Sequence, residues 1–178
     1  MASLPGFDSP AVGFDLPYEM LTACHERVQR TLDLLGRLIR HVEKNGHDAQ
    51  SRSAAADVLR YFDLAAPLHH QDEELHVFPP LLAGEDAALQ AVVHRLQGDH
   101  REMEALWAAL RPALQGWCET DASGPAEAPW LQQAARFVAL YVAHLPVEET
   151  LVFPAAQAGR SRAQQVAMGA EMKARRQG

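Results

Sequence analysis

The first clear pattern in the chain is a stripe of apolar residues that starts just after Pro17. Between positions 21 and 42, apolar residues return at alternating steps of three and four, which is the spacing of one face of an α-helix. Proline is tolerated in a first helical turn, where its missing N–H costs nothing, and Gly46 is suited to a helix end. The pattern predicts a helix over about 17–45, preceded by an irregular arm over 1–16.

Three more apolar stripes follow, separated by polar segments or by segments rich in glycine and proline. They predict helices over about 51–82, 86–118 and 129–158, with a loop over 119–129 and a short helix over 161–175. Pro112 lies inside the third helix and is expected to kink or break it near its C-terminal end. No segment alternates as a strand does, so the predicted class is all-α. Four long helices joined by short turns predict an antiparallel up-down-up-down four-helix bundle over 17–158, followed by a short C-terminal helix or tail over 159–178.

Histidine and glutamate occupy positions in these stripes where apolar residues would be expected to continue. Each long helix carries at least one of them. A single histidine in such a stripe is more often a hydrogen-bonded core residue, but here the paired motifs described next favour ligands to a metal. The six candidate metal-ligating residues are His25, His69, Glu73, His100, His144 and Glu148.

The second and fourth predicted helices contain related segments. Residues 61–79 and 136–154 align without gaps, and each carries His-x-x-x-Glu-Glu-x-x-Val-Phe-Pro. In a helix, residues i and i+4 share a face, with their Cβ atoms about 5–6 Å apart. One imidazole and one carboxylate therefore point the same way from each helix. The repeat predicts two helices that present similar groups to one shared site.

A carboxylate buried without a partner is costly, so groups of this kind aimed into a bundle require compensation. A pair of metal ions provides it, because carboxylates can bridge two ions and imidazoles can complete the coordination of each. This mixture of ligands suits two iron ions, with manganese or zinc as alternatives.

Composition and charge narrow the classes of function. The 178 residues carry a formal net charge of −7, which argues against binding to nucleic acid or to an anionic membrane. Two cysteines are too few for a disulfide scaffold. The N-terminus lacks the features of a secretory signal, and no apolar run approaches the roughly 20 residues that a membrane span needs. We therefore expect a cytoplasmic protein without membrane contact. The sequence gives no indication of the oligomeric state.

Taken together, these residues resemble the hemerythrin-like family, also known as the HHE cation-binding family. The resemblance extends from about Met20 to Ala155. It rests on one histidine in the first and third helices and on His-x-x-x-Glu in the second and fourth. It implies a non-haem di-iron centre in which Glu73 and Glu148 bridge the two ions.

The sequence departs from the oxygen-carrying hemerythrins on the third helix. Those proteins have two histidines one turn apart there, whereas Leu96 and Glu104 flank His100 at these spacings. Glu104 and His70 are therefore candidates for an additional ligand, and His76 is expected to pack beside the site. Glu74 and Glu149 recur in both repeats, and we interpret them as helix-surface charges in preference to groups that steady an imidazole.

The incomplete histidine set favours a protein that binds or senses a small diatomic ligand, dioxygen or nitric oxide, or that responds to iron or redox state. Catalytic turnover is less expected. The alternative is a di-iron enzyme or repair factor that acts on peroxide, nitric oxide or iron–sulfur centres. Such repair proteins typically add an N-terminal domain with a cysteine, and only about 16 residues precede the predicted bundle here.

Overall fold

The computed structural model describes residues 12–119 and 126–177, and within them it is helical with no strand. The predicted all-α class is therefore confirmed. Residues 1–11 of the expected arm and 120–125 of the expected loop lie outside the described residues. The helices are α1 (Pro17–Asn45), α2 (Ala49–Arg60), α3 (Ala66–Asp72), α4 (Phe78–Leu82), α5 (Ala87–Glu119), α6 (Ala128–Val147), α7 (Phe153–Ala158) and α8 (Arg162–Arg175). Three π-helical turns lie between them: η1 (Tyr61–Ala65), η2 (Glu73–Val77) and η3 (Glu148–Val152).

The ends of the first two helices follow from local chemistry. Gly46 adopts a φ of 75° and its N–H donates to the carbonyl of Val42, which ends α1 as predicted. The second helix begins at Ala49, two residues earlier than expected, because Asp48 caps it. The Asp48 carboxylate accepts from the Ser51 N–H at 2.8 Å, and the Ser51 hydroxyl accepts from the Asp48 N–H at 2.9 Å.

The π turns explain how the segments 49–82 and 128–158 stay helical despite internal prolines. Each π turn ends two residues before a proline, at Pro67, Pro79 and Pro154. A proline has no N–H to donate, and its ring clashes with the carbonyl four residues earlier. That carbonyl lies in the middle of each π turn, where the wider turn accommodates the ring.

Pro112 behaves differently from the sequence expectation. The helix α5 continues through it to Glu119 as one element, so the predicted break does not occur. Pro112 is exposed. On the outer face of a helix, the carbonyl that a proline leaves unpaired can tilt toward water.

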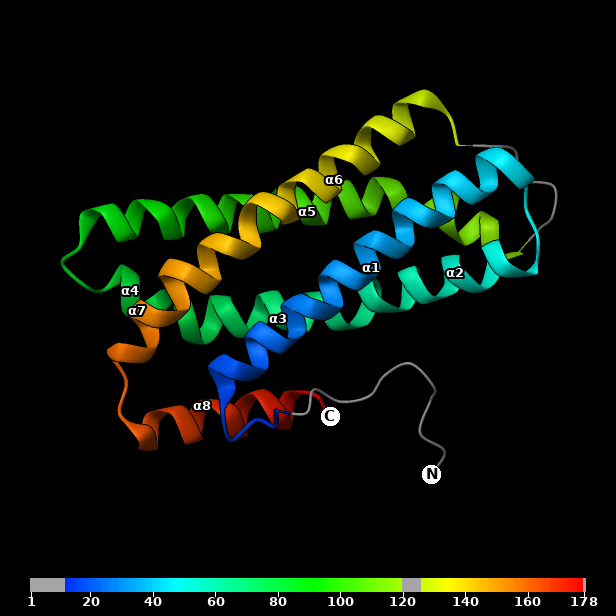
Figure 1. The fold of residues 1–178 in the computed structure, drawn as a ribbon. Helices are drawn as coiled ribbons and strands as arrows, with labels where there is room; N and C mark the ends of the chain where they lie inside the picture. Colours follow the sequence, from blue (N-terminus) through cyan, green and yellow to red (C-terminus); the bar gives the residue numbers. More distant parts are fainter. Residues whose placement is uncertain (1–11, 120–125, 178) are drawn as a thin grey trace.

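Figure 1 shows α1, the segment 49–82, α5 and the segment 128–158 lying alongside one another, with the chain reversing direction between them. Their buried apolar side chains form two separate clusters. One cluster includes Val28, Phe62, Met103 and Tyr141, and the other includes Leu21, Val77, Leu96 and Val152. Each long segment therefore passes from one apolar cluster to the other, and the buried histidines and glutamates lie at the crossing.

The C-terminal helix is part of the packed structure. The predicted tail helix is present as α8, and its Met168 and Met172 are buried in the second apolar cluster. Asp72, which is fully buried, forms ion pairs with Arg175 and Arg176 at the end of α8. These contacts hold α8 against α3, close to the buried polar residues.

One helical segment, Ala128–Ala158, is long and apolar enough to cross a membrane by length and composition alone. This differs from the sequence expectation that no such segment exists. The core helix of a soluble protein meets the same criterion, and 44% of the apolar window is buried inside the structure.

Candidate metal centre

Six polar side chains meet in the layer between the two apolar clusters. They are the six candidates from the sequence, and they come from every long helical segment. Each is at most 6% exposed, and both glutamates are completely buried. The glutamates are the first residues of the π turns η2 and η3, in keeping with the frequent occurrence of π turns at functional sites. The contributing elements are α1 (His25), α3 (His69), η2 (Glu73), α5 (His100), α6 (His144) and η3 (Glu148).

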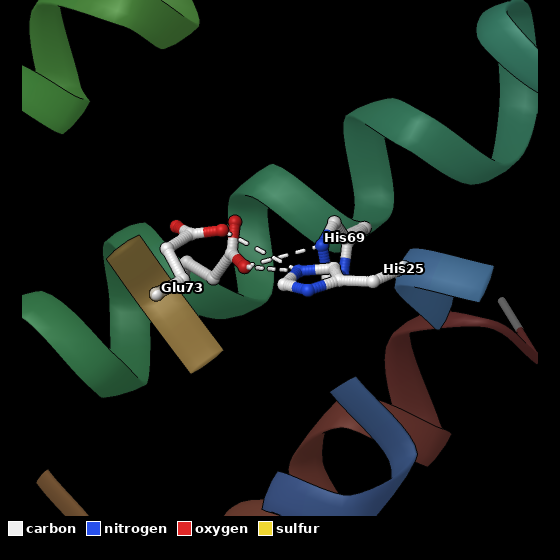
Figure 2. Close-up of side chains that lie close together, drawn as sticks. His25, His69 and Glu73 are labelled. Atoms are coloured by element: carbon white, nitrogen blue, oxygen red, sulfur yellow. Dashed lines mark ion pairs between the residues drawn. The ribbon is translucent and has the colours of Figure 1, made fainter. Parts of the chain in front are cut away.

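The first half of the layer contains His25, His69, Glu73 and Glu148, whose ligand atoms all lie within 4.8 Å of one another. The Nε2 atom of His69 is 3.1 Å from Oε1 of Glu73, and the Nε2 atom of His25 is 3.7 Å from the same oxygen. Figure 2 shows the two imidazoles, one from α1 and one from α3, pointing at the Glu73 carboxylate. His25 Nε2 also lies 3.4 Å from Oε2 of Glu148.

The second half contains His100, His144 and Glu148. The Nε2 atoms of the two imidazoles are 3.2 Å apart, and His144 Nε2 is 3.0 Å from Oε1 of Glu148. His100 Nε2 is 3.4 Å from Oε2 of Glu73. Each glutamate therefore turns one carboxylate oxygen toward the first half and the other toward the second, which is the placement that a bridging carboxylate requires.

The buried carboxylate oxygens lack hydrogen-bond partners. Neither oxygen of Glu73 nor of Glu148 accepts a hydrogen bond, although imidazole nitrogens lie near all four. Ligands bound to one metal ion at 2.0–2.2 Å are separated from one another by about 3–3.5 Å. Four of the five contacts, at 3.0–3.4 Å, fall within that separation, and the fifth, between His25 and Glu73, is 3.7 Å. The donor set thus fits cations placed between these groups better than it fits direct pairing.

Without cations the layer is electrostatically conflicted. Burial, together with the charge of Glu148, raises the pKa of Glu73. Burial alone would lower the pKa of His25, but the nearby Glu148 and Glu73 outweigh it and raise that pKa to about 10. Burial lowers the pKa of His69 well below its usual value. The two neighbouring imidazoles are thus driven to opposite protonation states, His25 to the charged form and His69 to the neutral form. Cations bound by both glutamates would remove this conflict.

A comparison with family models matches residues 16–167 of the chain to the hemerythrin HHE cation-binding domain. The chain belongs to that family. It is also 33% identical over 161 residues to an uncharacterised protein of Haemophilus influenzae, and the match covers 90% of each chain. The resemblance inferred from the sequence is confirmed, and the match extends beyond the four predicted long helices into α8.

Three further carboxylates hold the outer nitrogens of the histidines in this hemerythrin-like site. His25 Nδ1 lies 2.8 Å from Glu149, His100 Nδ1 lies 3.0 Å from Glu74, and His144 Nδ1 lies 3.2 Å from Asp99. An imidazole that donates from Nδ1 keeps its Nε2 lone pair free to face a metal. The interpretation of Glu74 and Glu149 as surface charges is therefore wrong. Their recurrence in both repeats was the signal, whereas Asp99 has no counterpart in the repeats and gave none.

The other candidate ligands lie outside both groups. The His70 ring stacks on that of His100, with centroids 4.1 Å apart, and its Nε2 is 3.3 Å from the Tyr141 hydroxyl. His76 pairs with Glu171 of α8. Glu104 is exposed.

A cavity of about 290 Å³ lies beside the second half of the site. Its inner wall is formed by buried side chains, and its mouth by exposed residues of α3 and α5. The inner wall includes Phe62, Met103, Phe137, Tyr141 and His100. The cavity gives this half of the hemerythrin-like site a route to solvent. A shallower hollow of about 490 Å³, lined by His25 and Glu149 among others, lies beside the first half.

Proposed function

We propose that this protein is a non-haem di-iron protein that binds a small ligand such as dioxygen or nitric oxide and thereby senses it, or responds to iron or redox state. One observation carries the proposal. Two fully buried glutamates present four oxygens that accept no hydrogen bond, and four imidazoles, one from each long helical segment, surround them. Burial of these groups is costly, and cations placed among them would offset that cost.

The residues divide between the two ions in a definite way. His25 and His69 would hold one ion, His100 and His144 the other, and Glu73 and Glu148 would bridge them. We also infer that the four long segments form the antiparallel up-down-up-down four-helix bundle expected from the sequence, since each contributes to this shared site. Manganese or zinc would suit the same donors, although mixed imidazole and carboxylate ligation is typical of iron.

With both glutamates bridging, each position has four protein donors: two imidazoles and one oxygen from each glutamate. The donors are gathered more closely at the first position, where His25, His69, Glu73 and Glu148 form one group, than at the second, where the group comprises His100, His144 and Glu148. Four protein donors leave a six-coordinate ion with room for an exogenous ligand. Bound iron would supply that open position and a reversible change of oxidation state. The chain itself supplies the apolar surroundings, the cavity and the carboxylates that orient the imidazoles.

A di-iron enzyme or repair factor is the second candidate. The cavity favours it, because about 290 Å³ is much more space than a diatomic ligand needs. Turnover of peroxide or nitric oxide by the loaded protein would support this candidate over simple binding.

The test is the metal content of the purified protein and of isosteric variants. Wild type is expected to hold about two iron ions per chain, whereas Glu73→Gln and Glu148→Gln should each lose most of the metal because the amide cannot bridge. Glu102→Gln is the matched control, since Glu102 forms only an exposed ion pair with Arg136. Visible spectra recorded anaerobically, then with dioxygen and with nitric oxide, test ligand binding. Equal metal content in all four proteins, or no metal in any of them after anaerobic loading, would refute the proposal.

A further inference from the structure

We infer that the cavity beside His100 binds a neutral aromatic molecule with a single ring and a hydroxyl group, the size and chemistry of a phenol. This inference deepens the proposed function and rests on it for the identity of the neighbouring metal site. The cavity itself is formed by protein side chains, whether or not metal is bound.

The volume sets the size of the ligand. A closed apolar cavity of about 150 Å³ is sufficient to bind benzene. The present cavity of about 290 Å³ is open at one side, and it lies at the lower end of the range for sites of small organic molecules. It therefore has room for one substituted ring, and it is far too large to be matched to dioxygen or nitric oxide.

The walls indicate a flat, mainly apolar ligand. Four aromatic rings line the cavity and touch one another. The ring centroid of Phe62 lies 5.0 Å from that of Trp107 and 4.9 Å from that of Phe137. The ring centroid of Phe137 lies 5.1 Å from that of Tyr141. Aromatic pairs prefer offset-stacked or edge-to-face packing, so a further ring entering the cavity can make contacts of the same kind with these walls.

One polar pair interrupts the aromatic wall. The Tyr141 hydroxyl lies 3.3 Å from His70 Nε2, and both residues line the cavity. A tyrosine hydroxyl can donate to the imidazole and still accept a hydrogen bond from a ligand. This pair is a suitable partner for a ligand hydroxyl. A purely apolar molecule would leave the Tyr141 hydroxyl without the hydrogen bond that it can still accept.

The mouth of the cavity favours a neutral ligand. The exposed residues Arg101 and Glu104 both lie at the mouth, and their charges are opposite. Farther in, the Glu74 carboxylate is already held by His100 Nδ1 and by the Gln97 amide. One arginine against two glutamates in the lining disfavours an anion, and the Glu74 carboxylate, which already accepts from two partners, has little left to offer a cation.

The position of the cavity connects this ligand to the centre. The His70 ring that lines the cavity is stacked on His100, with 10° between the ring planes. A phenol held by the Tyr141–His70 pair would lie one ring away from a candidate ligand of the second metal position. The cavity thus places an organic molecule beside the second half of the site, which His100 shares with the cavity wall.

The direct test is calorimetric titration of the purified, iron-loaded protein with phenol and with toluene, its apolar analogue. Phenol is expected to bind once per chain with a dissociation constant below about 1 mM. Toluene should bind about threefold to tenfold more weakly, because it cannot make the hydrogen bond. In Tyr141→Phe the affinity for phenol should fall to that of toluene, while the affinity for toluene stays the same.

A second variant blocks the cavity without disturbing the core. Glu104→Trp places an indole over the mouth and should weaken phenol binding by about tenfold or more. Glu104→Gln removes the same charge and leaves the mouth open. Ala109→Trp adds the same side chain at an exposed position of α5 that does not line the cavity. Both controls should bind phenol as wild type does.

Several results would overturn the inference. These are no saturable binding of phenol up to about 10 mM, equal binding by wild type and Glu104→Trp, or tighter binding of benzoate or benzylamine than of phenol. Iron content measured on the same samples separates this inference from the proposed function. Phenol binding by a protein that takes up no iron would support the cavity and refute the iron site. Iron uptake without phenol binding would do the opposite.

Discussion

The contact between Glu149 and His25 allows a quantitative prediction. Glu149 belongs to η3, and its carboxylate accepts from His25 Nδ1 at 2.8 Å. We predict that Glu149→Ala weakens iron binding while leaving the fold intact, because the imidazole loses the group that fixes its orientation. Removal of a carboxylate behind a metal-bound histidine typically lowers metal affinity by about 10–100-fold.

The magnitude follows from the geometry. A hydrogen bond to a charged group contributes about 1.5–3 kcal/mol. The Glu149 side chain is 39% exposed, so water screens the charge and can partly replace it, which places the effect near the lower bound. A loss of about 1.5 kcal/mol corresponds to about a tenfold increase in the dissociation constant for iron.

The assay is competition for ferrous iron between the protein and a chromophoric chelator under anaerobic conditions. Glu26→Ala is the control, because Glu26 is an exposed acid next to His25 in the sequence and lines no part of either ligand group. It should bind iron as wild type does. Circular dichroism will show whether Glu149→Ala is folded. If the folded variant has a dissociation constant for iron within twofold of that of Glu26→Ala, then the Glu149 carboxylate does not orient His25, and the role assigned to the carboxylates at the Nδ1 atoms is wrong.

Three further predictions concern stability, each measured by thermal unfolding. Asp72→Ala removes a fully buried partner of two arginines on α8 and should lower the free energy of unfolding by about 3 kcal/mol, or Tm by about 6–12 °C. Glu85→Ala, at an exposed position, should change Tm little, and equal effects of the two variants would show that α8 is not held by this contact. Gly169→Ala should destabilise the protein, because a Cβ there would lie 1.8 Å from the backbone oxygen of Phe14 in the N-terminal arm. Gly36→Ala meets nothing nearer than 3.5 Å and should stabilise the protein by up to about 1 kcal/mol. The reverse order of stabilities would contradict the packing of α8 on the arm. Backbone hydrogen bonding from the first turn of α2 lowers the pKa of Asp48 below its usual 3.8, so its contribution is present above that value and is lost as the pH falls through the lower folded-state pKa. The Tm difference between wild type and Asp48→Ala should therefore shrink on acidification below about pH 4, and a difference that stays constant would argue against the cap.

Periodicity was sufficient to predict the helices and the six residues that converge. The spacing of three and four residues determines which side of a helix faces inward, and residues 69 and 73, like 144 and 148, keep that spacing up to the first residue of a π turn. Because ligand and apolar positions lie on one stripe, a chain that buries the stripe must also bury the ligands. Convergence thus follows from the same pattern that predicts the fold.

The contacts of His76 were not predicted, and the π turn η2 explains why. His76 shares a helical face with His69 and Glu73 only if the helix stays regular, but η2 begins at Glu73 and shifts the phase of the residues that follow. His76 therefore points toward α8 and pairs with Glu171. The roles of Glu74, Glu149 and Asp99 depend on how far one helix slides along its neighbour. No pattern within a single helix contains that information.

The separation of the apolar interior into two clusters has a thermodynamic consequence. The ions proposed for the layer between them would offset the cost of burying its charged groups, so each bound ion would contribute directly to the free energy of unfolding. Such a contribution grows with the logarithm of the free ion concentration above the dissociation constant, reaching about 4 kcal/mol at a thousandfold excess. The thermal stability of this protein is therefore expected to vary with the supply of metal.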